Sequence, residues 1–196
     1  MADDATHETP DPKSASARSG ALSAALPVAF LAFFASGATG LIFQSIWSRY
    51  LSHVFGASSV AISTTVTVFM AGLGLGAFLA GRVAERIKHP LMTYAFVEGL
   101  VGLWALVLPM LVDPEGWLAD VNRALHAGDA GAFGLILGRF AAVLPILLLP
   151  TTLMGASLPL LSRHFVSRAG DAGSVSSLVG ALYAVNTLGA CVGVGL

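Results

Sequence analysis

The sequence predicts an all-α protein, a polytopic bundle of transmembrane helices with about five spans, the fifth of them truncated. Hydrophobic residues make up 56% of the chain and charged residues 11%. Soluble domains carry a charged share of about 25%. The apolar residues also fall in runs near or above the roughly 20 residues that a helix needs to cross ~30 Å of hydrocarbon. Because lipid cannot hydrogen-bond an exposed backbone, these runs must be helical.

The predicted spans follow one another with short polar connections. In chain order they are residues 26–47, 60–80, 91–112, 133–161 and 178–196. The fourth run is longer than a bilayer requires, and Pro145, Pro150 and Pro159 interrupt it. Since proline removes a backbone donor, we expect a kink near Pro150. The loop at 113–130 places Trp117 and Leu125 at helical spacing, which predicts either a short interfacial helix or an ordinary connecting loop.

The two ends of the chain differ in character. Residues 1–24 are polar and rich in Asp, Ser, Ala and Pro, so we expect a disordered cytoplasmic tail, followed by a transmembrane domain over residues 25–196. The last span stops at Leu196 without a polar flank. A helix does not normally end in lipid in this way, so we interpret the chain as a piece of a longer protein.

The distribution of basic residues predicts the orientation in the cell membrane. With the N-terminus inside, the cytoplasmic segments hold seven of the ten Lys and Arg residues, and the outer loops hold two. The positive-inside rule therefore favours a cytoplasmic N-terminus, with Arg86 and Arg168 inside and Arg123 outside. The net charge of −1 gives no indication of a nucleic-acid partner; the predicted surroundings are the lipid bilayer.

Glycines at helical spacing are expected to form packing faces. Gly72, Gly74 and Gly76 lie inside the second span, and Gly189 and Gly193 repeat the four-residue spacing in the fifth. A cofactor-binding glycine loop would need a strand before it, so close helix packing is the better interpretation. We expect the second span to pack on the first or the fourth.

Glu98 and Arg139 are the two charges predicted to lie within the hydrocarbon, where each costs about 2.5–3.5 kcal/mol on insertion scales. We expect them to face the bundle interior at neighbouring heights and to approach one another. One interpretation is an intramembrane site for a cation or a proton relay, with Glu98 as the ligand. The other is a structural salt bridge, or an Arg139 side chain that reaches to the surface.

Further polar groups in or near the spans are Gln44, Tyr183 and Asn186, which we expect to bond between helices rather than to bind substrate. The five His residues are scattered, and no His, Cys and Asp cluster has metal-ligand spacing. The sequence gives no candidate catalytic residue and no candidate metal site.

Five strings together resemble the membrane domain of the membrane-bound spermidine synthase-like family. They are Ser36-Gly-Ala-Thr-Gly40 with Gln44-Ser-Ile-Trp47-Ser-Arg49, Val54-Phe-Gly56, Gly72-Leu-Gly-Leu-Gly76 with Gly81-Arg82, Leu149-Pro-Thr-Thr-Leu-Met-Gly-Ala-Ser-Leu-Pro159, and Leu182-Tyr-Ala-Val-Asn-Thr-Leu-Gly-Ala190. Each string is weak alone, but their order and spacing match along nearly the whole chain after the tail. One departure is Gln44, where such proteins often carry an acid.

The resemblance implies a role in polyamine biosynthesis for the parent protein. Family members join a multi-span region to a cytoplasmic aminopropyltransferase domain, which would bind decarboxylated S-adenosylmethionine and a diamine. That domain is missing from this chain, so the chain itself should be catalytically inert, and a polyamine is the ligand that its membrane part would meet. The membrane half of the family also resembles major facilitator transporters. A fragment of such a transporter and a pure membrane anchor are therefore the alternatives.

Overall fold

The computed structural model describes residues 12–55, 58–111, 117–128, 131–166 and 172–195. It is an all-α bundle, as predicted, with the helices α1 (Pro12–Phe55), α2 (Ser58–Val83), α3 (Pro90–Leu111), α4 (Trp117–Ala127), α5 (Ala132–Val166) and α6 (Ala172–Gly195). A 3-10 turn, η1 (Ala84–Arg86), follows α2. Five of these helices are long and apolar enough to cross a membrane. The predicted spans therefore correspond to α1, α2, α3, α5 and α6.

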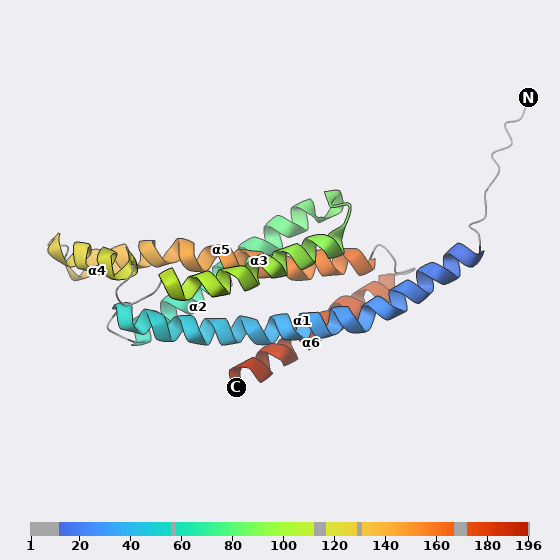
Figure 1. Cartoon of the computed structure of the whole chain (residues 1–196), viewed down its shortest axis with the longest axis horizontal. Coiled ribbons are helices and arrows are strands. Elements are labelled where there is room, and N and C mark those ends of the chain that lie inside the picture. The colour runs from blue at the N-terminus through green and yellow to red at the C-terminus, as the bar shows by residue number, and fades with distance from the viewer. Residues whose placement is uncertain (1–11, 56–57, 112–116, 129–130, 167–171, 196) are drawn as a thin grey trace, which may run out of the picture.

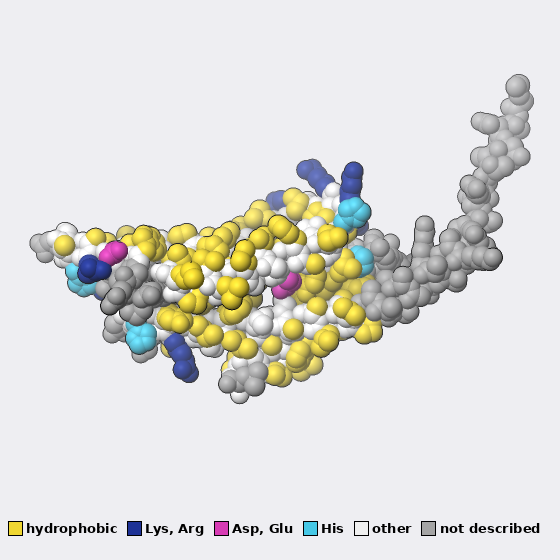
Figure 2. Space-filling view, in the orientation of Figure 1, with side chains coloured by type: hydrophobic (Ala, Val, Ile, Leu, Met, Phe, Trp, Pro, Cys, Tyr) yellow, Lys and Arg dark blue, Asp and Glu magenta, His cyan; other side chains and the backbone are white. Residues whose placement is uncertain are grey.

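The long helices run side by side along the molecule, and α4 lies at one end against the start of α5 (Figure 1). Helix α5 packs on both α2 and α3, while α1 packs on α2 and α6. Side chains follow this arrangement. Lys and Arg gather towards the two ends of the face in Figure 2, and hydrophobic side chains cover the length between them. This distribution is compatible with a bundle that spans a membrane.

Helix α1 differs from its predicted bounds, and α4 decides between two predictions. Helix α1 begins at Pro12, inside the predicted tail of residues 1–24, and residues 1–11 lie outside the described part. A proline is well suited to a first helical position because its missing N–H has no partner there, and several alanines follow it. Of the two predictions for residues 113–130, a short helix or an ordinary connecting loop, the structure has the helix: α4 carries Asp120 and Arg123, paired one turn apart on its surface.

Glycines fix how closely two helix pairs approach. A Cβ atom at Gly76 would overlap the backbone carbonyl oxygen of Thr152 on α5, and one at Gly72 would overlap the Thr151 side chain. On the other pair, Gly189 and Gly193 of α6 lie against the backbone of α1. Any side chain at these positions would separate the helices.

Gly74 has no neighbour within 4 Å of where its Cβ would be, so the prediction that it faces another helix is wrong. It lies two residues from both Gly72 and Gly76. Two residues correspond to about 200° of helix rotation, which turns Gly74 to the opposite face of α2. Only the four-residue spacing of Gly72 and Gly76 keeps two glycines on the face that meets α5.

Helix α5 continues through all three of its prolines. Pro150 has no N–H, so the carbonyl of Ile146 loses its helical partner. The indole Nε1 of Trp104 on α3 donates to this carbonyl at 3.0 Å. The Ile146 carbonyl, which Pro150 leaves without a helical donor in an apolar environment, thus accepts a hydrogen bond that joins α3 and α5.

Candidate functional site: an acidic residue between three helices

Glu98 lies in the first half of α3 and accepts two interhelical hydrogen bonds. The hydroxyl of Ser36 on α1 donates to Glu98 Oε1 at 2.9 Å, and the hydroxyl of Ser157 on α5 donates to the same oxygen at 2.8 Å. Neither bond uses Oε2. Three helices that are far apart in the sequence therefore converge on one carboxyl group. An acidic side chain is visible on the face in Figure 2 at mid-length of the molecule, among hydrophobic side chains.

The two serines behave differently from most hydroxyl residues in the spans. Several Ser and Thr hydroxyls, such as those of Thr65 and Thr152, donate to a carbonyl one turn back in their own helix. This is the usual satisfaction of a hydroxyl in an apolar environment. Ser36 and Ser157 instead donate across to Glu98. Ser157 is buried, so its bond to Glu98 is sheltered from water.

Glu98 has no basic partner in the described part of the chain. The ion pair found among these residues is that of Arg123 and Asp120 on α4. The partners of the Glu98 carboxyl are neutral hydroxyl groups, which can orient it but cannot balance a charge. An acidic group without a counter-charge, on an apolar helix, is a candidate binding site for a cation.

The predicted approach of Glu98 to Arg139 is wrong. Arg139 and Ser157 are both on α5, and 18 residues separate them, which corresponds to about 27 Å along a helix. Ser157 contacts Glu98, so Arg139 lies far from it. The expected neighbouring heights came from counting Arg139 from the outer end of the fourth span. Helix α5 has 35 residues, and Arg139 lies in its first turns beside His126 of α4, at 3.4 Å between Nη2 and Nε2.

The other predicted polar residues do not join Glu98 in one site. Asn186 of α6 donates from Nδ2 to the backbone oxygen of Phe33 on α1 at 3.0 Å, which is an interhelical bond of the expected kind. Tyr183 is 64% exposed on the surface of α6. The Oε1 atom of Gln44 is buried and has no hydrogen-bond partner among the residues that the structure describes. In the described residues no three His, Cys, Asp or Glu side chains are grouped as metal ligands.

Sequence reasoning missed Ser36, Ser157 and Tyr94 as neighbours of Glu98. Tyr94 precedes Glu98 by one helical turn on α3, so its position on the same face could have been read from the spacing. Its ring packs edge-on against Phe33 of α1, with 6.4 Å between centroids. The two serines carry no comparable signal, because their role depends on which faces of α1 and α5 turn towards α3.

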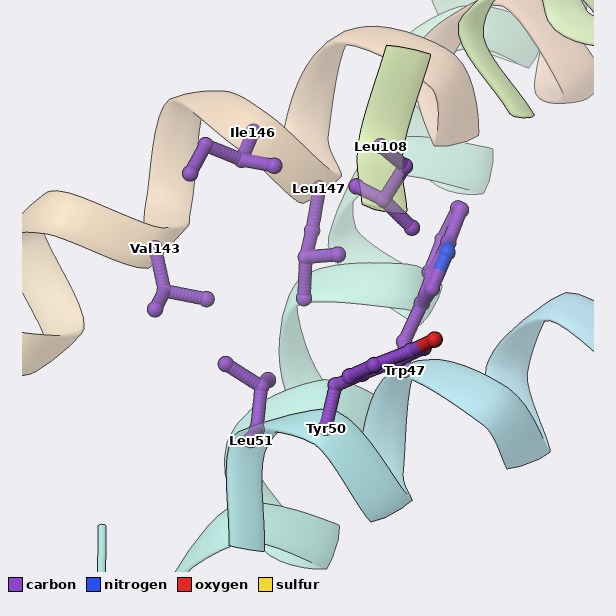
Figure 3. Close-up of a pocket in the computed structure, with 7 residues that line it drawn as sticks. All are labelled: Trp47, Tyr50, Leu51, Leu108, Val143, Ile146 and Leu147. Atoms are coloured by element: carbon purple, nitrogen blue, oxygen red, sulfur yellow. The ribbon is translucent and has the colours of Figure 1, made fainter. Parts of the chain in front are cut away.

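A separate apolar pocket lies between α1, α3 and α5, about ten residues further along α3 than Glu98 (Figure 3). Trp47 and Tyr50 lie on its α1 side, opposite Val143 and Leu147 of α5. The other lining residues are Leu51, Leu108 and Ile146. With almost wholly apolar walls, the pocket offers little to orient a polar ligand. The Glu98 site therefore remains the candidate for chemistry.

Comparison of the chain with protein-family models, with curated proteins and with solved structures found no match.

Proposed function

We propose that this chain is the membrane domain of a spermidine synthase-like protein, and that Glu98 provides the negative charge of an intramembrane site for a polyamine. The proposed site is supported by the hydrogen-bond partners of Glu98. Two hydroxyl groups hold the carboxyl, and no basic side chain among the described residues neutralises it. An ionisable residue kept within a span at a cost of about 2.5–3.5 kcal/mol is a functional candidate by default.

The chemistry of the site suits an ammonium group. An ammonium carries a full positive charge and N–H donors, and a carboxylate accepts such donors in short, charge-assisted hydrogen bonds. Ser36 and Ser157 occupy Oε1, so Oε2 is the atom that these two bonds leave to a ligand. A protonated amine of a polyamine would supply the missing counter-charge.

The residue strings that resemble the spermidine synthase-like family support the same proposal. Ser36 belongs to the first of these strings, Ser157 to the fourth and Asn186 to the fifth. All three make interhelical hydrogen bonds, two of them to Glu98. The strings are therefore associated with contacts around this site. In this proposal the aminopropyl transfer from decarboxylated S-adenosylmethionine belongs to a further domain, and the present chain contributes membrane attachment and polyamine binding.

We further propose that the chain lies in the cell membrane with its N-terminus in the cytoplasm. The excess of Lys and Arg in the segments on that side of the spans supports this orientation. Glu98 would then lie closer to the cytoplasmic surface, because it is eight residues from the start of α3. A polyamine from the cytoplasm would reach it within about 12 Å of the helix start.

Equilibrium binding of radiolabelled spermidine to the purified protein in lipid nanodiscs tests the proposed site. We expect saturable binding to the wild type and a loss of at least tenfold in affinity for Glu98→Gln, which keeps the shape but removes the charge. Glu85→Gln, an exposed acid in η1, is the matched control and should bind like the wild type. Equal binding by Glu98→Gln and wild type would reject the site.

The sequence that follows in the parent gene tests the family. A strand, a glycine-rich loop and a helix, with acidic residues downstream, within the next ~150 residues would fit the synthase-like protein. Six further apolar spans would point instead to a transporter of the major facilitator type. An uptake assay with the full-length parent in proteoliposomes would then measure whether spermidine crosses the membrane.

A further inference from the structure

Tyr94 presents a buried polar atom without a partner in the part of the chain that the structure describes. The residue is 5% exposed, and its hydroxyl oxygen makes no hydrogen bond there. Leaving a buried hydroxyl unsatisfied costs about 1–3 kcal/mol, and an apolar span offers no bulk water to replace the bond. Such an atom calls for a physical explanation, and a role in binding a ligand is one.

The position of Tyr94 connects it to the Glu98 site. It lies one turn before Glu98 on the same face of α3. Phe33 of α1 packs against its ring, and Ser36, one turn further along α1, donates to Glu98. The phenol and the carboxyl are therefore held by the same two helices, α1 and α3.

We propose that Tyr94 is a second ligand-binding residue of the Glu98 site and that it makes the site select amines. Its oxygen accepts a hydrogen bond from an N–H of the bound ammonium while Glu98 balances the charge. A proton alone would be satisfied by the carboxyl group, and a quaternary ammonium, which has no N–H group, would leave the phenol unpaired. This inference rests on the proposed function and adds the residue that distinguishes a protonated amine from a quaternary ammonium.

The aromatic ring of Tyr94 could also attract an ammonium group bound beside it. The face of an aromatic ring attracts a cation within about 6 Å. A phenylalanine at position 94 would keep this attraction, as well as the packing on Phe33, and would lose the hydrogen bond alone. Tyr94→Phe therefore isolates the hydroxyl. Tyr183→Phe is the matched control, because Tyr183 is exposed on α6.

The test measures spermidine binding and thermal unfolding on the same four proteins in nanodiscs: wild type, Tyr94→Phe, Tyr183→Phe and Glu98→Gln. We expect Tyr94→Phe to bind spermidine about tenfold more weakly, a factor that corresponds to ~1.4 kcal/mol for one hydrogen bond to a charged donor. Its unfolding temperature should equal or exceed that of the wild type, because the hydroxyl has no hydrogen-bond partner among the described residues. Tyr183→Phe should change neither quantity.

A fully quaternised spermidine provides the second arm, since it keeps the positive charges and lacks every N–H donor. Its affinity should be the same for wild type and Tyr94→Phe. The proposal is overturned if Tyr94→Phe binds spermidine like the wild type, if it weakens both ligands equally, or if it lowers the unfolding temperature. If Glu98→Gln abolishes spermidine binding and Tyr94→Phe leaves it unchanged, the proposed role of Tyr94 is rejected and the proposed Glu98 site is retained. Absence of spermidine binding to the wild type rejects both.

Discussion

At the scale of single residues, polar atoms that have no access to water form hydrogen bonds between the helices of the bundle. Glu98 meets two serines from other helices, and Trp104 meets a carbonyl that Pro150 has left free. In both cases a group that would be costly to bury alone is satisfied across a helix interface. These bonds orient α3 relative to α5 with a specificity that apolar packing in lipid does not supply.

The bond of Trp104 gives a prediction that depends on the proline. Trp104→Phe should lower the free energy of unfolding by about 1 kcal/mol, because the Ile146 carbonyl loses its only interhelical donor. In a Pro150→Ala background the alanine N–H restores the helical bond, so Trp104→Phe should have a smaller effect. Unfolding in mixed micelles measures the four proteins of this cycle. Equal losses in the two backgrounds would contradict the account.

The residue scale also shows what the sequence could and could not predict about the site. Glu98 stood out because it is an acid inside an apolar run. Its partners could not be identified, since Ser36 and Ser157 resemble other small residues until the helix faces are known. Arg139 was misplaced because its height was counted from the outer end of the fourth span, and α5 is longer than a bilayer requires. In the structure the first turns of α5, which contain Arg139, pack against α4.

At the scale of helices, the bundle is set by two close crossings, α2 on α5 and α1 on α6. Both rely on glycines four residues apart, at 72 and 76 and at 189 and 193, which approach the backbone of the partner. The spacing was readable from the sequence. The partner of each face was not, because small-residue motifs specify how closely helices approach but not which helix they meet.

The crossing of α2 and α5 makes a prediction with an internal control. Gly76→Leu should destabilise the fold by several kcal/mol or prevent folding, because its side chain would overlap the Thr152 backbone. Gly74→Leu should leave stability unchanged within about 0.5 kcal/mol, because that position has open space. Thermal unfolding monitored by circular dichroism in detergent compares the two. A stable Gly76→Leu protein, or a Gly74→Leu protein that does not fold, would contradict the packing described here.

At the scale of the whole molecule, the order of the five long helices and the charge at both ends predict the membrane topology. Reporter fusions should place Arg86 and Arg168 in the cytoplasm and Arg123 outside. This predicted orientation rests on the distribution of basic residues alone, so moving basic residues from one loop to another should change it. A fusion after Arg123 that reports a cytoplasmic position would contradict the predicted topology.

The class of the molecule was fully predictable, because hydrophobicity and span length decide it. Its start was not: α1 extends to Pro12 in a segment whose composition suggested disorder. The alanines of this segment favour a helix, whereas its polarity favours disorder. Prediction of membrane spans uses the polarity and not the helix propensity. The functional account depends on a different property of the whole, which is that one carboxyl group lies within the apolar length of the bundle without a basic partner among the described residues.

Labelling with a hydrophobic carbodiimide tests this central claim most directly, because the reagent partitions into lipid and modifies carboxyl groups there. Mass spectrometry of the modified protein locates the label, and a parallel sample contains saturating spermidine. We predict modification at Glu98 in the free protein and protection of Glu98 when spermidine is bound, with Glu85 unaffected by the ligand. Equal labelling of Glu98 with and without spermidine would contradict the proposal that this carboxyl group binds the polyamine.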